Sequence, residues 1–374
     1  MKNRIYKYFF HEFIRYFLVT LFALVSVIWT IQAVNFLDLV TDDGHAFRIY
    51  FLYSLLTLPK IFTKLIPFSF LVASILTILK LEKDNELIIL WTSGLNKIHI
   101  VNLIFRISLI VMFLQLILAS IINPQTLNFS RTLLKNSELQ FVPSLLKEKQ
   151  FNDTVKGLTI FVNKKKPDGS YENILIRDEG KVLTQISSGT STIYAKAGYV
   201  TEDEKNLILI DGSMQKIEKG SDINIIKFKK TSINLAGLST KTISEPKIQE
   251  TSTLKILLCM QNINIDLHNC NGYEKNLRDI KIEINKRFGM PMYIPLIALV
   301  CSFLLASRRD KKNFFFNKYI YFFLCILILI SSEITVRYSG ISWNHTALYY
   351  LLPIGILPII YFSLIRSFKY ENLE

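Results

Sequence analysis

The sequence predicts an α-helical membrane protein with six transmembrane helices, grouped three and three around an inserted β-domain. Half of its 374 residues are apolar, and the mean hydropathy is +0.31. A soluble globular chain of this length is normally less apolar. The apolar residues cluster in stretches long enough to cross a bilayer, whereas residues 131–287 are polar and contain short β-rich runs. These observations together define the fold class.

Six stretches are candidate spans, because a helix needs about 20 mostly apolar residues to cross roughly 30 Å of hydrocarbon. They are Phe17–Leu37, Phe51–Leu79, Ile107–Ser130, Phe288–Ser307, Phe314–Ser332 and Thr346–Ile365. The second is interrupted by Lys60 and Lys64, and the fifth contains Lys318, so these lysines must snorkel or face a polar cavity. The first stretch is too long for a cleavable signal peptide, and we expect it to remain as an anchor.

The distribution of Lys and Arg predicts the orientation. The two termini and the two loops on their side carry fifteen basic residues, whereas the two short loops opposite carry only Arg48 and Arg337. Basic residues favour the cytoplasmic side. We therefore expect both termini in the cytoplasm and the middle domain outside it. The expected domains are residues 1–130 with three spans, 131–287 with the β-domain, and 288–374 with three more spans.

The middle domain contains seven short β-rich runs. They are Leu158–Val162, Glu172–Arg177, Leu183–Ser187, Thr192–Ala195, Asn206–Ile210, Ile223–Phe228 and Ser232–Leu235. Lys166-Pro167-Asp168-Gly169 and Asp211-Gly212 have the composition of turns. Strands at this spacing are typical of a sandwich, a jelly roll or an open barrel. Gln249–Met260 and Tyr273–Phe288 have helical patterns, and the latter leads into the fourth span.

The sequence contains no recognisable catalytic or metal-binding motif. His11-Glu12-Phe13-Ile14-Arg15 has Arg where a metalloprotease helix needs a second His. A P-loop and a G-x-S-x-G elbow are both absent. Cys259 and Cys270 can pair on the oxidising side, but two unrelated thiols is the favoured interpretation. The net charge of +14 is divided between two sides of a membrane and indicates no nucleic-acid partner.

Lys60 and Lys64 form the first polar feature of interest. They lie one helical turn apart, between Pro59 and Pro67, and project from one helix face. Two like charges at that depth are expensive when they face lipid. Either they line a cavity that receives an anionic headgroup, or the second span begins later and both lysines snorkel outward. The residues alone leave both alternatives open.

Residues 82–94, between spans two and three, form the second feature. They predict a helix of about three turns that ends at Gly94. Leu87, Leu90 and Trp91 lie along one stripe, which must pack against something. The alternatives are the protein's own bundle, the membrane surface, or a cytoplasmic partner for which Glu86 offers a charged contact.

Three stretches resemble the LptF/LptG permeases of the lipopolysaccharide export transporter. The most specific runs from the second span into the loop that follows it: Leu58-Pro59-Lys60, Ile66-Pro67-Phe68, Asn85-Glu86-Leu87 and Thr92-Ser93-Gly94-Leu95. The second is Asn123-Pro124-Gln125, with Arg131 beyond it. The third is the β-domain order of Ile160-Phe161-Val162, Pro167-Asp168-Gly169, Asn173-Ile174-Leu175-Ile176 and Asp211-Gly212, with Arg287-Phe288 before span four. The similarity covers essentially the whole chain.

The resemblance implies an inner-membrane permease subunit of an ABC transporter, with no ATPase, metal or cofactor of its own. Such a subunit passes lipopolysaccharide from the outer leaflet through a periplasmic jelly roll to bridge proteins. The implied partners are a paralogous LptF or LptG subunit, a cytoplasmic LptB ATPase dimer, and LptC and LptA-like proteins. The β-domain resembles LptF more closely, while Lys60 is closer to LptG, and we expect LptF.

The resemblance also implies where lipopolysaccharide binds. Lys60 and Arg131 fall where basic residues of the family's cavity can meet lipopolysaccharide phosphate, and Lys64 adjoins them. Asn35 and Leu134 depart from the pattern, because family members often have basic residues at these positions. Fewer cavity charges imply a lipid A with different phosphates, or a division of labour with the paralogous subunit.

The implied ATPase-coupling segment contains Glu86, Leu87, Leu90, Trp91 and Gly94, with Glu86 as the acid that faces the ATPase. Two rival classes remain for comparison. A secondary transporter needs buried acidic residues or broken helices, and the long uncharged spans offer only Glu333, at a span end. A non-transporting assembly or sensor protein would use its β-domain to bind a periplasmic partner.

Overall fold

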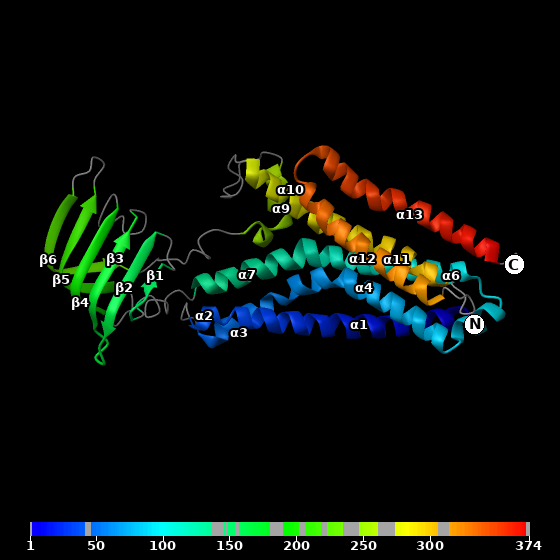
Figure 1. Ribbon diagram of the computed structural model, residues 1–374, viewed down its shortest axis with the longest axis horizontal. Coiled ribbons are helices and arrows are strands. Elements are labelled where there is room, and N and C mark those ends of the chain that lie inside the picture. Colours follow the sequence, from blue (N-terminus) through cyan, green and yellow to red (C-terminus); the bar gives the residue numbers. More distant parts are fainter. Residues whose placement is uncertain are drawn as a thin grey trace. The chain divides into compact units, whose positions relative to one another are not determined.

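The computed structural model describes residues 2–41, 46–136, 146, 148–153, 157–179, 190–201, 206–217, 223–234, 247–260, 274–305 and 314–371. The chain forms two compact units (Figure 1). One comprises residues 1–30, 57–127 and 247–374 and is helical. The other comprises residues 31–56 and 128–246 and contains a β-sheet.

Six helical stretches of the described chain are long and apolar enough to cross a membrane. They are Arg4–Val40, Phe47–Lys83, Lys97–Lys135, Leu277–Leu305, Tyr319–Tyr338 and Trp343–Lys369. Each overlaps one of the six predicted spans, so the prediction of three spans, an inserted β-domain and three spans is confirmed.

The helical unit contains most of the spanning segments. Its longer helices are α1 (Lys2–Asn35, as far as Thr30), α4 (Leu58–Lys83), α6 (Lys97–Ile117), α10 (Glu274–Gly289), α11 (Tyr293–Ser302), α12 (Phe314–Tyr338) and α13 (Trp343–Glu371). Its shorter elements are α5 (Glu86–Thr92), η1 (Leu118–Ile122), η3 (Ile248–Glu250), α9 (Thr253–Met260), η5 (Met290–Met292) and η6 (Phe303–Leu305). The turn η1 is π-helical and joins α6 to α7 (Asn123–Asn136).

Helix α11 lies at the centre of this unit. All ten of its residues are buried, and it contacts α4, α6, α12 and α13. A helix that is apolar all round is expected to be covered on every side. Around it the core includes Phe13 and Phe70, whose ring centroids are 5.3 Å apart. Helices α1, α12 and α13 instead expose large apolar side chains, as a surface that meets lipid or another subunit does.

The start of α1, helix α5 and the end of α13 meet at one end of the helical unit. The Tyr8 hydroxyl donates a hydrogen bond to Glu86 at 3.0 Å. The Lys97 ammonium lies 5.5 Å from the centroid of the Trp91 ring and 5.7 Å from that of Phe368. Figure 1 likewise shows the beginning of α1 and the end of α13 at the same end of this unit.

The other unit contains one antiparallel sheet of six described strands. They are β1 (Phe151–Asn152), β2 (Leu158–Lys165), β3 (Tyr171–Asp178), β4 (Ser191–Val200), β5 (Asn206–Ile217) and β6 (Ile223–Asn234). Each pairs with the next, so their order across the sheet is the chain order (Figure 1). Alternate residues at the start of β2, and of β3 from Ile174 onward, are buried, which gives these strands one covered face. The unit also contains α2 (Asp38–Thr41) and α3 (Phe47–Leu56).

The described strands differ from the predicted runs where two of the runs form one strand. Ile223–Phe228 and Ser232–Leu235 were predicted as separate strands, but residues 223–234 form the single strand β6. The predicted run Leu183–Ser187 lies outside the described residues. Short polar interruptions do not end a strand whose backbone remains paired, and Lys229 and Lys230 therefore lie inside β6.

One predicted turn is confirmed and the other is wrong. Residues 166–169 form the turn between β2 and β3, with Gly169 at φ +81° and its N–H bonded to the Lys166 carbonyl. Asp211 and Gly212 instead lie within β5. Asp211 adopts φ +48° there, and a Cβ on Gly212 would come within 2.3 Å of the Tyr194 carbonyl oxygen. Glycine is needed for this close approach between strands, not for a reversal of the chain.

The described parts of the segment after the sheet, residues 247–260 and 274–289, are helical, as predicted, with a break between η3 and α9. The predicted helix Gln249–Met260 is a 3₁₀ turn, η3, followed by α9, and α10 continues through η5 into α11. Cys259 is disulfide-bonded, whereas separate thiols had been the favoured interpretation; Cys270 lies outside the described residues. Cys301 and Cys325 are free and buried, with their sulfur atoms 3.6 Å apart.

Candidate functional site

A polar cavity of about 260 Å³ lies inside the helical unit. Its walls come from α4, α6, η1, the start of α7, η3, α10, η5 and α12. Six charged side chains line it: Lys60, Lys64, Glu283, Lys286, Arg287 and Glu333. Four basic groups against two carboxylates leave a net charge of +2. A cavity of this size holds a polar headgroup and is too small for a whole multi-acyl lipid.

Two of the cations are paired with the two carboxylates. Lys286 binds Glu333 at 2.9 Å, and Arg287 binds Glu283, one helical turn away, at 3.0 Å. The Arg287–Glu283 pair is buried, and breaking it would leave an uncompensated charge, whereas the Lys286–Glu333 pair is partly exposed. The acidic residues of the cavity are therefore already engaged.

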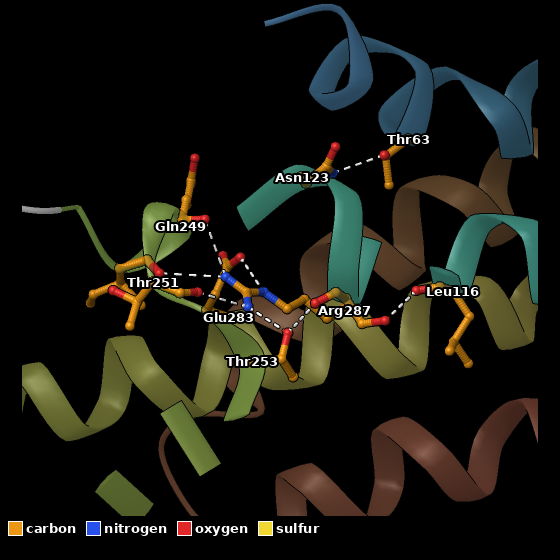
Figure 2. Close-up of polar contacts among 10 residues, drawn as sticks. Thr63, Leu116, Asn123, Gln249, Thr251, Thr253, Glu283 and Arg287 are labelled. Carbon is orange, nitrogen blue, oxygen red and sulfur yellow. Dashed lines mark hydrogen bonds and ion pairs between the residues drawn. The ribbon is translucent and has the colours of Figure 1, made fainter. Parts of the chain in front are cut away.

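Arg287 organises one wall of the cavity (Figure 2). Only 3% of its surface is exposed. Besides the bond from Nε to Glu283, Nη1 donates to the Thr253 hydroxyl at 2.8 Å. Nη1 and Nη2 also donate to the backbone carbonyl oxygens of Ile248, Gln249 and Thr251. This guanidinium holds residues 248–253, which follow the sheet in the chain, against α10. We therefore assign Arg287 a structural role.

Lys60 and Lys64 are different, because neither makes an ion pair or a hydrogen bond with the residues that the structure describes. Lys60 is half-buried and Lys64 is exposed, and both line the cavity. The structure thus supports the first of the two alternatives drawn from the sequence, a pair of lysines on a cavity wall. Their binding to an anionic headgroup stays a prediction.

Two amide side chains line the same cavity, and Thr63 orients both. The Gln115 amide nitrogen donates to the Thr63 carbonyl oxygen at 3.0 Å. The Asn123 amide nitrogen donates to the Thr63 hydroxyl at 2.8 Å, and that hydroxyl donates to the Pro59 carbonyl oxygen. The side-chain oxygens of Gln115 and Asn123 are buried and have no partner among the described residues. Figure 2 shows the Asn123 oxygen turned away from Thr63.

Arg131, the third predicted lipopolysaccharide ligand, lies on α7 in the unit that contains the sheet. It is half-buried. Lys60 and Lys64, in the helical unit, are brought together in one site. Leu134, one turn further along α7, is buried, and Asn35 is exposed at the end of α1.

The predicted coupling segment is shorter than expected. Helix α4 extends to Lys83, and Asn85 at φ +59° separates it from the two turns of α5. Gly94, at φ +83°, follows α5, as predicted for a residue that ends a helix. The predicted single helix over residues 82–94 is wrong because Asp84 and Asn85 form a turn.

The face that α5 exposes also differs from the predicted stripe. Leu87 is 6% exposed and belongs to the core, and Leu90 and Trp91 pack against that core. Ile88 and Ile89 are the exposed apolar side chains, at 55% and 64%. The predicted stripe packs on the protein's own bundle, which was the first of the three alternatives.

Several residues of the cavity were not predicted from the sequence. Gln115 carries a usable signal, because an amide in the middle of an apolar span needs a hydrogen-bonding partner. Glu333 was noted at a span end, but its pairing with Lys286 joins residues 47 positions apart and has no local signal. No group of three or more His, Cys, Asp or Glu residues in the described ranges is placed to hold a metal ion.

Comparison with known proteins places the chain in a family. Residues 7–367 match the family model of the lipopolysaccharide export system permease LptF/LptG. A protein of Rickettsia prowazekii (strain Madrid E), RP871, is 26% identical over 238 residues, which are 63% of this chain and 64% of that protein. The match thus spans somewhat less than two thirds of the relative. Because the family model covers nearly the whole chain and the fold agrees with it, the protein belongs to the LptF/LptG family of lipopolysaccharide export permeases and is a multi-pass inner-membrane protein.

Proposed function

We propose that the chain is one permease subunit of a transporter that extracts lipopolysaccharide from the outer leaflet of the inner membrane. In this proposal a paralogous LptF or LptG subunit completes the transport pathway, and a separate LptB dimer hydrolyses ATP. The β-sheet unit passes the lipid to LptC and an LptA-like bridge in the periplasm. The observation that carries the proposal is the family match over residues 7–367.

The physical chemistry of extraction agrees with a powered process. Moving acyl chains out of a bilayer costs about 0.8 kcal/mol for each CH₂ group that becomes exposed. A multi-acyl lipid therefore needs both an apolar cover and an external energy source. The chain has no P-loop, so the proposal assigns ATP hydrolysis to another subunit.

In this proposal Lys60 and Lys64 bind phosphate groups of lipopolysaccharide. An ammonium at membrane depth is expensive unless it is paired, and the two carboxylates of the cavity are already engaged. An anionic ligand would remove this cost. Arg131 is proposed to contact a second anionic group elsewhere on the lipid.

The proposed docking site for the ATPase is α5, with Glu86 as its charged contact and Ile88 and Ile89 as its exposed apolar side chains. Glu86 also accepts a hydrogen bond from Tyr8 of α1. Lys80 of α4 also forms an ion pair with Glu12 of α1 at 2.9 Å. A movement of α5 would therefore be transmitted to α1, and rigid-body closure of the helices is the proposed mechanism.

ATP-dependent release of lipopolysaccharide from proteoliposomes tests the coupling role. The charge reversal Glu86→Lys should abolish release while the subunits remain assembled. Lys83→Glu is a matched reversal, because it changes an exposed charge at the other side of the Asp84–Asn85 turn. Full activity of Glu86→Lys would contradict the proposed coupling.

Purification in mild detergent, with mass spectrometry of bound protein and lipid, tests the assembly. An ATPase, a second six-span subunit and lipopolysaccharide should be recovered together. A homodimer that carries neither ATPase nor glycolipid would instead favour the non-transporting assembly or sensor protein.

A further inference from the structure

The cavity contains two kinds of unmet hydrogen-bonding capacity. Lys60 and Lys64 offer donors and positive charge, and no carboxylate among the described residues pairs with them. The side-chain oxygens of Gln115 and Asn123 are acceptors that lack a donor there. A simple anion can satisfy the lysines, but it brings no donor for the two amide oxygens.

The orientation of the amides follows from Thr63. The Thr63 carbonyl oxygen can only accept, so Gln115 must present its NH₂ group to it. The Thr63 hydroxyl hydrogen is engaged by the Pro59 carbonyl oxygen, so this hydroxyl accepts from the Asn123 NH₂ group. Neither amide can be reversed without losing its bond to Thr63. Both side-chain oxygens are therefore left for another donor.

Gln115 is a buried polar side chain that is held in position in the cavity wall. It is 3% exposed, it lies in an otherwise apolar stretch of α6, and it lines the cavity. Buried polar atoms in folded proteins almost always have a partner. An acceptor that is held in position by Thr63 and still lacks a donor points to a ligand or to bound water.

We infer that the cavity binds a headgroup in which a phosphate monoester neighbours hydroxyl or amide N–H donors, as in a phosphorylated amino sugar, with Lys60 and Lys64 holding the phosphate and Gln115 and Asn123 accepting from the sugar. Thr63 is the positioning residue that keeps both oxygens available. The inference rests on the proposed function for the identity of the lipid, and it adds the basis on which one anionic lipid is selected over another.

Selectivity between two phosphate monoesters tests this reading. The assembled permease complex in nanodiscs is titrated with bisphosphorylated lipid A and with phosphatidic acid, which has a phosphate monoester but no sugar donors. Two neutral hydrogen bonds correspond to a preference for lipid A of about tenfold or more. In Gln115→Leu/Asn123→Leu, the affinity for lipid A should fall by about tenfold, and the affinity for phosphatidic acid should not change.

Three further variants separate the roles. Lys60→Gln/Lys64→Gln should lower the affinities for both lipids by similar factors, because it removes the positive charge that binds the phosphate. Thr63→Val keeps the shape of the side chain and should reduce the preference without changing the affinity for phosphatidic acid. Asn102→Leu is the matched control, since Asn102 is an amide of the same helix that bonds to Tyr361 and does not line the cavity. It should leave the preference unchanged.

The outcomes distinguish this inference from the proposed function. If Gln115→Leu/Asn123→Leu lowers the affinities for both lipids equally, or leaves the preference for lipid A intact, the two amides have a purely structural role. The inference is then overturned, even when ATP-driven release is normal. If the wild-type complex prefers lipid A and the amide variant lowers that preference by about tenfold, the inference stands, even when ATP releases no lipid and the permease role fails.

Discussion

The guanidinium of Arg287 donates to the hydroxyl of Thr253 at 2.8 Å. That hydroxyl in turn donates to the carbonyl oxygen of Ser120, within the π-helical turn η1. One hydrogen-bonded chain therefore joins α10, the start of α9 and the third span. Thr251 and Thr253 are thereby hydrogen-bonded to α10 and η1, two elements that line the cavity.

Arg287→Lys tests this connection. Lysine keeps the charge but lacks the planar set of N–H donors with which the guanidinium binds Glu283, Thr253 and three carbonyl groups. We expect the free energy of unfolding to fall by about 2–4 kcal/mol, because buried acceptors lose their partners. Thermal unfolding in detergent measures the change. Arg337→Lys, at an exposed position of α12, should be neutral; an equal loss in both variants would contradict the assigned role.

Gly289→Ala tests the packing of α10 against α13. A Cβ at Gly289 would lie 2.1 Å from a ring carbon of Tyr349, which is fully buried. We expect a loss of about 1–3 kcal/mol from overpacking. Gly355→Ala is the matched control, because a Cβ there meets no atom within 4 Å. That change should be neutral or stabilising by up to about 1 kcal/mol, since alanine favours the helix. Unfolding temperatures that move together would refute the packing argument.

Ile88→Asn/Ile89→Asn tests the corrected face of α5. These side chains are exposed and contribute little to the fold, so the variant should remain folded. We expect it to lose most of the copurifying ATPase, because an interface depends on a few apolar anchors. Leu87→Ala should instead destabilise the protein by about 2–5 kcal/mol, since Leu87 is in the core. Normal ATPase recovery with the Ile88/Ile89 variant would place the docking surface elsewhere.

The turn between β2 and β3 should show a defined pH response. A hydrogen bond from Lys166, at 2.7 Å, together with its charge, lowers the pKa of Glu172 below the ordinary value. Hydrogen bonds from Ser170 lower the pKa of Asp168, and the bond to Glu172 raises the pKa of Lys166.

These pKa shifts determine whether the fold gains or loses stability as the pH changes. The two carboxylates stabilise the fold above their ordinary pKa of about 4, and this contribution disappears as the pH falls through their lowered pKa values. The Lys166 contribution is complete below its ordinary pKa and is lost as the pH rises through its raised value. In Lys166→Gln, the pKa of Glu172 should rise towards the ordinary value. NMR of ¹³C-labelled glutamate carboxyls, assigned with Glu172→Gln, measures it; an unchanged pKa would show that the contact is not maintained in solution.

The spans could be predicted because membrane insertion depends on local composition, and each apolar stretch carries its own signal. Which face of α5 is buried could not be predicted in this way. Residues 86–92 are apolar on most sides, so periodicity shows that Leu87, Leu90 and Trp91 share a face but not that this face is the covered one. The choice depends on the rest of the bundle, which the local sequence does not encode.

The candidate site was only partly predictable for a similar reason. Lys60 and Lys64 are four residues apart, so their common face follows from helix geometry. The contacts of Thr63 with Gln115 and Asn123 join residues 52 and 60 positions apart. The turn predicted at Asp211-Gly212 was wrong because an Asp-Gly pair occurs in turns and also where a glycine permits close approach between strands.

The π-helical turn η1 determines which changes in chain length the site can tolerate. Gln115 and Asn123 are eight residues apart, and in a regular α-helix, at about 100° per residue, they would point about 80° apart. A π turn accommodates one additional residue, so the two amides behave as though seven apart and share a face within about 20°. Deleting one residue from 118–122 should therefore straighten the helix and preserve the amide pair. Adding one residue should rotate Asn123 away from Thr63, so shortening and lengthening this span are not equivalent.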